Sequence, residues 1–346
     1  MSNFFTLPIK KVTRLTEKSV QLSFDLSDEL RASYKFIPGQ YLTLQTSING
    51  ESVRRSYSIC SAPDEDLAIA VKAIDQGVFS NYANEQLKDG DVLEVHPPEG
   101  SFQLEASNTP KKYVAFAAGS GITPVLSMLK SSLKQAPESE FVLAYGNKSK
   151  AEAMFLDELK HLQSSYKDRF QLIEIYSRTQ EDNAKFGRIE KPFVNYVLKN
   201  MYKDVDFDAY FICGPEEMIE GVKKTLTENS VEKDKIQFEL FYSSAEEAIE
   251  TKDGMTSINV TVDDETFSFQ MGQDEVILDA ILAKDIDAPY SCQGGICSSC
   301  VAKITKGKAV MKKNQILTDE EVEEGLVLTC QAHPTTPEIH VDYDDL

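Results

Sequence analysis

Four cysteines near the end of the chain constrain its fold more than any other feature. Cys292, Cys297, Cys300 and Cys330 are spaced C-x4-C-x2-C, with the fourth cysteine after a long gap. This is the plant-type spacing of a [2Fe–2S] cluster, in which four thiolates converge on two irons. A disulfide pair, a zinc site or an unrelated scatter are the alternatives, but zinc sites usually contain two CxxC-type pairs and only one is present. The spacing therefore predicts these four cysteines as cluster ligands in a protein that transfers single electrons.

The residues around these cysteines predict a tight loop that a strand completes. Gly294 and Gly295 would let the backbone fold around a cluster and direct amides at its sulfurs. Cys330 follows Leu326–Thr329, and this stretch is predicted as the end of a strand. The histidines of the chain show no metal-ligand spacing, which argues against a Rieske-type cluster and predicts surface or structural roles. They are His96, His161, His333 and His340.

Length and composition predict a globular protein of two to three domains, since the chain has 346 residues. No apolar run approaches the roughly 18 residues needed to span a bilayer. The first residues, Met1–Phe5, lack the charged-then-apolar order of a signal peptide. We therefore expect no membrane association and a cytoplasmic location, where Cys60 and Cys213 would remain free thiols.

The net charge of −20 argues against nucleic acid as a partner, because phosphates would be repelled. The acidity is concentrated near the end of the chain. Residues 257–346 contain six Lys, no Arg and seventeen Asp and Glu, a net charge of −11. Ordinary solubility explains this equally well. The functional alternative is an acidic face that steers a basic electron-acceptor protein.

The hydrophobic pattern changes along the chain and predicts three domains. Residues 1–107 alternate apolar and polar in short runs broken by Gly and Pro, which is typical of an antiparallel β-barrel. Residues 108–242 alternate strands with helices, which predicts an α/β domain with a parallel sheet. Residues 243–256 are polar and acidic and are predicted as a linker. Residues 257–346 would form a small α+β domain of β-grasp type. The helices expected are Thr123–Lys134, Ala151–Leu162, Glu216–Asn229 and Val276–Lys284.

A glycine pair in the second domain predicts a dinucleotide site. Gly119 and Gly121 follow an apolar strand and precede a helix with Thr123 and Pro124 in its first turn. They would allow a pyrophosphate to approach backbone amides at the helix N-terminus, where the helix dipole favours anions. The second strand ends at Asn147 without the acidic residue of a classical NAD fingerprint.

Two segments of the first domain could hold another phosphate-bearing cofactor. Arg55 and Tyr57 would lie on one face of a strand, so a guanidinium could grip a phosphate beside an aromatic ring. Gly77 and Ser80 precede a helix and offer a second anion cradle. The chain has only seven arginines, so the adjacent pair 54–55 is unusual. A solvated charge pair and an ordinary helix-capping serine are the alternatives.

Together these motifs resemble the ferredoxin–NADP reductase superfamily, and the whole chain resembles oxygenase reductases with a C-terminal plant-type [2Fe–2S] ferredoxin domain. Within that group it is most similar to the reductase subunits of phenylacetyl-coenzyme A epoxidases. The resemblance runs from about Phe4 to the end of the chain. Besides the cluster loop, it rests on Arg54–Cys60, Val71–Ile74, Gly119–Pro124, Tyr145–Asn147 and Phe211–Pro215.

The resemblance implies an FAD site in the first domain. Arg55 would pair with the FAD pyrophosphate, and Tyr57 would pack on the isoalloxazine. Ser58 would hydrogen-bond near the flavin N5 and counts with Cys213 as a catalytic residue. Gly77 and Ser80 would complete the pyrophosphate site.

The resemblance also implies where the nicotinamide cofactor binds. Cys213, with Gly214 and Pro215, would approach the nicotinamide, because hydride transfer needs both rings in contact at a fixed angle. Gly119, Gly121, Thr123 and Pro124 would hold the nucleotide. Phe241 takes the aromatic position beside the flavin or is an ordinary core aromatic.

The 2′-phosphate of NADP would lie near Ser177 and Arg178, with Lys185 and Arg188 downstream. Glu181 and Asp182 would partly cancel this positive field, and surface charges without a ligand are an alternative. We favour NADPH over NADH as the electron donor.

The implied function is a reductase that passes electrons from NADPH through FAD and the [2Fe–2S] cluster to a partner oxygenase component. By resemblance the partner is the di-iron epoxidase that acts on phenylacetyl-coenzyme A in phenylacetate breakdown. One alternative is a reductase for another acceptor, such as a ring-hydroxylating oxygenase or a hybrid-cluster protein. A non-enzymatic redox sensor is the alternative from another class.

Overall fold

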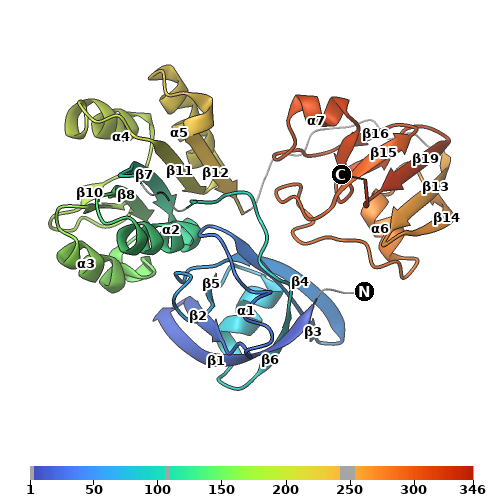
Figure 1. Cartoon of the computed structure of the whole chain (residues 1–346), viewed down its shortest axis with the longest axis horizontal. Coiled ribbons are helices and arrows are strands. Elements are labelled where there is room, and N and C mark those ends of the chain that lie inside the picture. The colour runs from blue at the N-terminus through green and yellow to red at the C-terminus, as the bar shows by residue number, and fades with distance from the viewer. Residues whose placement is uncertain (1–3, 106, 108, 242–253, 346) are drawn as a thin grey trace. The chain divides into compact units, whose positions relative to one another are not determined.

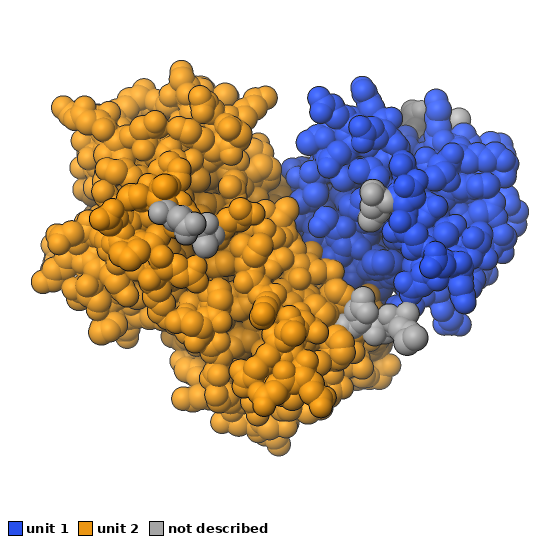
Figure 2. Space-filling view, in the orientation of Figure 1, with its two compact units in different colours: residues 1–3, 242–346 blue, residues 4–241 orange. Residues whose placement is uncertain are grey.

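The computed structural model describes residues 4–105, 107, 109–241 and 254–345. They form two compact units, which Figure 2 shows in different colours: residues 4–241, and the described residues from 254 onward. Most of the predicted linker 243–256 lies outside the described residues. Its last two residues belong instead to a strand, because Met255 and Thr256 pair with Gly272 and Met271.

The first unit begins with a six-stranded antiparallel sheet in the order β4-β3-β6-β1-β2-β5. A bridge between Ile59 and Ile69 joins the chain beyond β4 to β5 and helps to close the barrel. Alternating side chains, such as Leu42 and Leu44 on β3, are fully buried inside it. The elements are β1 (Phe5–Thr16), β2 (Ser19–Phe24), β3 (Tyr41–Ile48), β4 (Glu51–Ser58), β5 (Ala68–Lys72), α1 (Val78–Glu85) and β6 (Val92–Val95).

The same unit continues as a six-stranded parallel sheet in the order β10-β9-β8-β7-β11-β12. Helices α2 and α3 cover one face, and α4 and α5 cover the other (Figure 1). The strands are β7 (Lys112–Ala118), β8 (Glu140–Asn147), β9 (Phe170–Tyr176), β10 (Lys185–Phe186), β11 (Ala209–Gly214) and β12 (Ile236–Leu240). The helices are α2 (Ile122–Gln135), α3 (Leu156–Ser165), α4 (Lys191–Tyr196) and α5 (Glu216–Glu228).

The chain order reverses beside β7, because later strands add on one side of it until β11 returns to the other. Ligands of open α/β sheets bind at such a switch point, beyond the carboxyl ends of the strands. The sheet therefore places Gly119–Gly121 and Cys213–Pro215 side by side at the carboxyl ends of β7 and β11.

One predicted helix is wrong at its start. The expected helix Ala151–Leu162 begins only at Leu156, and a short 3₁₀ turn covers Lys150–Glu152. Phe155 has a left-handed backbone with φ of 58°, and Met154 is fully buried. This stretch is used as a buried loop, so packing overrides its local helical pattern.

The second unit is a five-stranded mixed sheet in the order β14-β13-β19-β15-β17, with a two-stranded ribbon β16-β18. The predicted fold class is confirmed for all three parts. The strands are β13 (Met255–Val262), β14 (Glu265–Gly272), β15 (Val301–Lys306), β16 (Ala309–Met311), β17 (Leu326–Leu328), β18 (Ala332–Pro334) and β19 (Glu338–Asp342). The helices are α6 (Ile277–Leu282) and α7 (Asp319–Glu323). None of the helices in the described ranges combines the length and apolar character that a membrane crossing requires.

Candidate redox sites

The two adjacent arginines of strand β4 have different surroundings. Arg54 donates to Gln45 Oε1 at 2.8 Å, and its guanidinium lies 4.6 Å from the centre of the Phe4 ring. Arg55 is exposed and donates to the Arg54 carbonyl at 2.7 Å. Arg55 is therefore the arginine of the pair that could receive an anion at the surface of the barrel.

Tyr57 connects this strand to helix α1. Its ring lies 5.4 Å from the ring of Phe79, with an interplanar angle of 36°. Burial raises the pKa of Tyr57 above its ordinary value, so the phenol stays neutral. The contact brings β4 beside the N-terminus of α1, where Gly77 is the N-cap.

The turn before α1 is tightly closed. The hydroxyl of Ser80 accepts the Ile74 N–H at 3.3 Å and is 6 % exposed. A Cβ on Gly77 would lie 2.2 Å from Ser80 Oγ, so only glycine fits. Since the Ser80 hydroxyl already serves the turn, an anion here would be held mainly by backbone amides.

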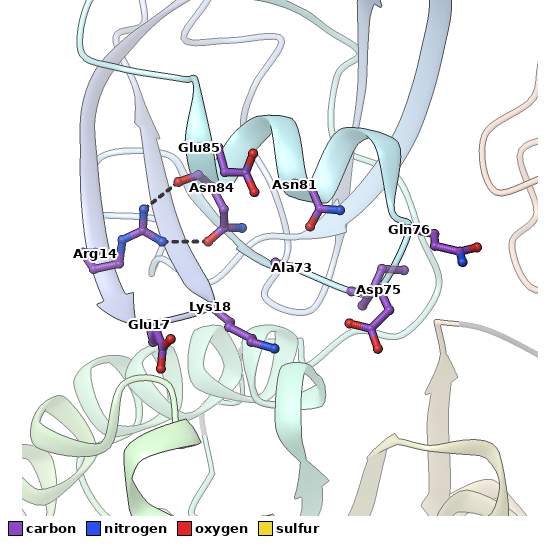
Figure 3. A pocket seen from close by; sticks show the side chains of 10 residues that line it. Arg14, Glu17, Lys18, Ala73, Asp75, Gln76, Asn81, Asn84 and Glu85 are labelled. Atoms are coloured by element: carbon purple, nitrogen blue, oxygen red, sulfur yellow. Dashed lines mark hydrogen bonds between the residues drawn. The ribbon is translucent and has the colours of Figure 1, made fainter.

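A polar cleft of about 560 Å³ opens beside this turn (Figure 3). The guanidinium of Arg14 donates to the side-chain and backbone oxygens of Asn84, at 2.9 and 2.6 Å. Ile74, at the edge of the cleft, is 64 % exposed. Amides and charges of both signs complete the lining: Gln76, Asn81, Lys18, Glu17, Asp75 and Glu85.

The Gly119–Gly121 turn packs directly against β11. Gly119 has a φ of +56°, and the Tyr145 hydroxyl donates to its carbonyl at 3.2 Å. A Cβ on Gly121 would lie 2.1 Å from the Cys213 carbonyl oxygen. Thr123 is buried and donates to the Ser120 carbonyl at 3.0 Å, so its hydroxyl closes the turn. Pro124 is also buried in the first turn of α2.

Ser58 and Cys213, the two predicted catalytic residues, meet at a third residue that the sequence interpretation missed. Ser58 Oγ donates to Glu239 Oε2 at 3.0 Å, although β4 and β12 lie in different sheets. Glu239 pairs with Cys213 in the register of β11 and β12. Cys213 is fully buried, and burial with the Glu239 charge raises the pKa of its thiol well above the ordinary value. The site therefore contains a neutral thiol beside a half-buried carboxylate.

Three further predicted residues lie at or just beyond the carboxyl ends of β11 and β12. Gly214 pairs with Leu240, and Pro215 is the exposed N-cap residue of α5. Phe241 follows β12 and is 38 % exposed, so the alternative of an ordinary core aromatic does not describe it.

The predicted 2′-phosphate residues gather at the end of β9. Ser177 N–H donates to the Asn147 carbonyl at 3.0 Å, and Arg178 N–H donates to the Lys148 carbonyl at 2.9 Å. Gly187 N–H donates to the Tyr176 carbonyl at 2.9 Å, and this hydrogen bond closes the loop 177–187. Lys185, Arg188, Glu181 and Asp182 are all exposed on or beside it. Phe186 is 62 % exposed, an unusual exposure for an aromatic side chain that the sequence interpretation did not single out.

A lysine cluster lies where the barrel meets the parallel sheet. Lys72 Nζ is 3.9 Å from Glu152 Oε2, and Ala73 N–H donates to the Lys18 carbonyl at 2.8 Å. Burial lowers the pKa of Lys72, and Lys148 and Lys18 lower it further against the opposing effect of Glu152. This group of lysines was not predicted, although Lys72 lies within a motif of the resemblance.

In the second unit the four predicted ligand cysteines are neighbours. Cys292 contacts Cys297 and Cys330, and Cys330 also contacts Cys300. Cys297, Cys300 and Cys330 are buried, and Cys292 is partly exposed. Neighbouring pairs of thiols suit two irons.

The backbone of the cluster loop fits a negatively charged group. The amides of Gly294 and Ile296 face the Cys292 sulfur, and Gly294 N lies 3.3 Å from it. The amide of Gly295 faces Cys330. Gly295 has a φ of +72° and a Cβ there would lie 2.9 Å from Gln331 Cγ, whereas Gly294 is not crowded. The tight turn therefore requires glycine at Gly295, and not at Gly294 as also expected.

Hydrogen bonds tie the fourth cysteine to this loop. Gln331 Nε2 donates to the Gln293 carbonyl at 3.0 Å. Both the N–H and the hydroxyl of Thr329 donate to the Cys300 carbonyl, at 3.1 and 2.9 Å. Cys330 lies two residues beyond β17, close to the predicted strand end. The neighbouring Cys292 thiol and burial raise the pKa of Cys297, so iron would bind by displacing protons from thiols.

Three family models match consecutive parts of the chain. The "Oxidoreductase FAD-binding domain" matches residues 6–104, and the "Oxidoreductase NAD-binding domain" matches residues 116–224. The "2Fe-2S iron-sulfur cluster binding domain" matches residues 260–335.

Curated relatives match along almost the whole length. One subunit of the 1,2-phenylacetyl-CoA epoxidase of Escherichia coli (strain K12) is 36 % identical, over 99 % of this chain and 99 % of its own. The ferredoxin reductase component of 3-ketosteroid-9-alpha-monooxygenase from Rhodococcus rhodochrous is 32 % identical, over 97 % and 96 % of the two chains.

Solved structures share the fold. Phthalate dioxygenase reductase superposes with a TM-score of 0.64 at 22 % identity, over 98 % of both chains. An intact type IV self-sufficient cytochrome P450 monooxygenase gives a TM-score of 0.71 at 21 % identity, covering 98 % of this chain and 41 % of its own.

Proposed function

This chain belongs to the family of oxygenase reductase components that join FAD-binding, NAD-binding and [2Fe–2S]-binding domains, and from this premise we propose that it reduces a di-iron phenylacetyl-coenzyme A epoxidase with electrons from NADPH. The family uses FAD, a [2Fe–2S] cluster and a nicotinamide nucleotide. The meeting of Ser58, Glu239 and Cys213 beside the nucleotide turn supports hydride transfer, and the identity of 36 % with an epoxidase subunit along the whole chain supports the acceptor.

When bound, FAD accepts a hydride and releases electrons singly to the cluster. The chain would supply position and charge. Arg55 would pair with the FAD pyrophosphate, as guanidinium groups do with phosphate. Tyr57 would pack against the isoalloxazine. Gly77 and Ser80 would shape the turn whose amides face the pyrophosphate.

The contact between Ser58 and Glu239 gives the site a route for a proton. Ser58 Oγ is 4 % exposed and would hydrogen-bond near the flavin N5. Glu239 accepts a hydrogen bond from Ser58 at 3.0 Å. Because it is only half-buried, it can also exchange a proton with solvent. Cys213, neutral and buried, would set the depth at which a nicotinamide ring rests. Phe241 would cover the opposite side of the flavin.

The nucleotide would lie along the carboxyl edge of the parallel sheet. Gly119, Gly121, Thr123 and Pro124 form the turn at the start of α2, and Gly214 and Pro215 form the facing one. A cation on the barrel side completes this region. Lys72 would pair with the NADPH pyrophosphate, because an ammonium group in this partly buried position can bind a phosphate.

At the other end of the nucleotide, Ser177, Arg178 and Lys185 would hold the 2′-phosphate. The exposed Phe186 would stack on the adenine. The acidic residues Glu181 and Asp182 reduce this preference without reversing it, and NADPH remains the proposed donor.

The cleft of Figure 3 would take the adenosine half of FAD. It begins at the turn that carries Gly77, and the exposed Ile74 offers an apolar surface to a flat ring. Asn81 and Gln76 supply amides, which match the donors and acceptors of adenine.

We also propose a basic docking surface on the acceptor protein. Residues 257–346 carry a net charge of −11, and α7 with the residues beside it exposes Asp319, Glu320, Glu323 and Glu324. Such a field would raise the rate of encounter with a basic partner. A reducing cytoplasm suits the buried free thiols of Cys60 and Cys213.

Reconstitution tests the acceptor. Purified reductase, NADPH and the epoxidase's catalytic component should consume NADPH in proportion to the phenylacetyl-coenzyme A epoxidised. The terminal oxygenase of a 3-ketosteroid-9-alpha-monooxygenase is the second candidate acceptor, because a relative of that system is 32 % identical. Faster coupled turnover with that oxygenase would reject the epoxidase assignment and retain the reductase chemistry.

A further inference from the structure

Helix α2 carries a buried cation that no redox step described above uses. Lys130, in the middle of the helix, is 5 % exposed in a chain of net charge −20. Its Nζ lies 2.6 Å from Glu65 Oε2 and 3.1 Å from Glu158 Oε1. Glu65 belongs to the barrel, in the loop between β4 and β5, and Glu158 belongs to α3. One ammonium group therefore links the barrel to the parallel-sheet layer.

The rest of the same helix face docks on the same loop. Lys134 Nζ lies 3.1 Å from both Asp64 Oδ2 and Glu65 Oε1. Ser127 Oγ donates to the Ser61 carbonyl at 2.7 Å. Positions 127, 130 and 134 recur at i, i+3 and i+7, so they share one stripe of the helix. The contact is polar, directional and repeated along two turns.

The loop and the helix that form this contact are both continuous in sequence with the proposed reaction site. The loop 59–67 follows Ser58 without interruption, and α2 follows Gly121, which packs on the Cys213 carbonyl. Close-packed interiors transmit displacements, so the position of the loop 59–67 on α2 affects the position of Ser58 relative to Gly121. The Lys130 contact and the Ser58–Glu239 hydrogen bond are thus two attachments between the layers, one behind the site and one within it.

We propose that Lys130 is a positioning residue for hydride transfer, and that its ion pair with Glu65 fixes the distance between the flavin-binding strand and the nucleotide turn. This rests on the proposed use of FAD and NADPH. A buried ion pair is weak evidence for stability, because desolvation offsets most of the attraction. Its directional geometry is better suited to setting an orientation. An error of about 1 Å in such a site can cost about a hundredfold in rate.

The rate at which the Cys60 thiol is chemically labelled reports on this contact without catalytic turnover. It lies in the same loop, is fully buried, and donates to the Ala68 carbonyl at 3.4 Å. Burial raises the pKa of Cys60 to about 12, and the neighbouring Lys130 charge opposes that rise. A thiol that is buried and protonated reacts slowly, so faster labelling would measure opening of the loop.

The experiment compares Lys130→Met with Lys130→Arg, which keeps the charge, and with Lys160→Met as a matched control. Lys160 pairs with Glu174 at 3.1 Å, and both residues belong to the parallel-sheet layer. Flavin bleaching by NADPH is followed anaerobically by stopped flow, and Cys60 labelling by mass spectrometry. Lys130→Met should lower the limiting bleaching rate roughly 10- to 100-fold with the NADPH dissociation constant within about twofold. Its Cys60 should label faster. Lys160→Met should match the wild type, and Lys130→Arg should recover most of the rate.

Glu65→Gln decides the outcome if Lys130→Met does not fold, since Glu65 is partly exposed and its loss removes only the barrel end of the pair. It should slow bleaching. Cys60 labelling is compared only between the Lys130 variants and the wild type, because the Glu65 charge itself helps to raise the pKa of Cys60. Wild-type bleaching rates in both variants, or unchanged Cys60 protection in Lys130→Met, would overturn the proposal. Failure of the wild type to bleach would reject the proposed function instead, and the labelling comparison would still test the contact.

Discussion

At the scale of single residues, a carboxylate connects two segments of the proposed reaction site. Glu239 accepts a hydrogen bond from Ser58 and lies beside Cys213 in the neighbouring strand. Burial and the Glu239 charge raise the pKa of the Cys213 thiol, so in the proposed site the thiol would be a neutral surface and not a nucleophile. Glu239 is therefore expected to handle the proton and Cys213 to shape the ring contact.

Replacing Glu239→Gln should separate these roles. The amide can still accept from Ser58 but cannot take up a proton, and general acid–base groups contribute typically about 10²–10⁴-fold. Hydride transfer would bring its own proton to the flavin, so we expect flavin reoxidation, in which that proton must leave, to slow at least about tenfold and its pH dependence to flatten. Stopped-flow traces across the pH range measure both. Glu232→Gln, exposed before β12, is the matched control, and equal rates for the two variants would contradict the role of Glu239.

Cys213→Ala tests the assignment of the nicotinamide contact. Removing the buried sulfur leaves a small cavity beside the nucleotide turn, so flavin reduction by NADPH should fall about tenfold through loss of orientation. The cluster spectrum should persist, because Cys213 is not one of the four neighbouring cysteines. Visible spectroscopy and rapid kinetics on one sample decide this. Loss of the cluster bands would show that the motif is wrongly assigned.

At the scale of elements, the site is made by close packing between a turn and a strand end. Gly121 has an ordinary backbone conformation, yet its Cα faces the Cys213 carbonyl so closely that no side chain fits. The glycine is required by the neighbouring strand and not by its own φ. Tertiary packing, more than local propensity, therefore determines this turn.

Gly121→Ala should accordingly damage both folding and nucleotide binding. Overpacking against backbone costs typically about 1–3 kcal/mol. We expect a lower melting temperature and weaker NADPH binding, measured by calorimetry. The control is Gly221→Ala within α5, where a Cβ meets nothing within 4 Å. That change should raise stability by roughly 0.5–1 kcal/mol, because alanine favours helix. An unchanged Gly121→Ala protein would refute the packing argument.

The elements also show what a sequence can and cannot predict. The cysteine spacing and the Gly119–Gly121 turn were predictable, because each motif is local and its residue types are demanding. Glu239 was not, because its partner Ser58 is 181 positions away and only the fold joins them. The start of α3 was mispredicted for the same reason: burial of Met154 and Phe155 in the core overrides the helical pattern. An acidic residue two positions before Phe241, in a mostly apolar strand, was the available signal for Glu239.

At the scale of the whole molecule, charge is distributed unevenly. The chain carries −20 overall, and residues 257–346 contribute −11 of it. Lys72 is paired with Glu152 and has Lys18 and Lys148 nearby, and in the proposed complex it would lie beside a nucleotide phosphate. In the proposed function, the acidic residues 257–346 would face a basic acceptor protein, and Lys72 would face a small anion.

Reduction of the partner protein should therefore slow as salt rises. Screening shortens the Debye length from about 10 Å at 0.1 M to about 3 Å at 1 M, which removes long-range steering. We expect the second-order rate with the oxygenase component to fall at least about tenfold between roughly 0.05 and 0.5 M salt. A neutral quinone acceptor should show little change. Equal salt dependence for both acceptors would remove the docking role and leave solubility as the reason for the acidity.

An anaerobic NADPH titration of the purified protein, followed in the visible spectrum, is the decisive experiment for the electron relay. We predict that flavin and cluster bands both bleach, with about three electrons taken up per chain, about two by FAD and about one by the cluster. Bleaching of the flavin alone would contradict the internal relay to the cluster. If neither set of bands responded, the hydride-transfer interpretation would be wrong and the redox-sensor alternative would take its place.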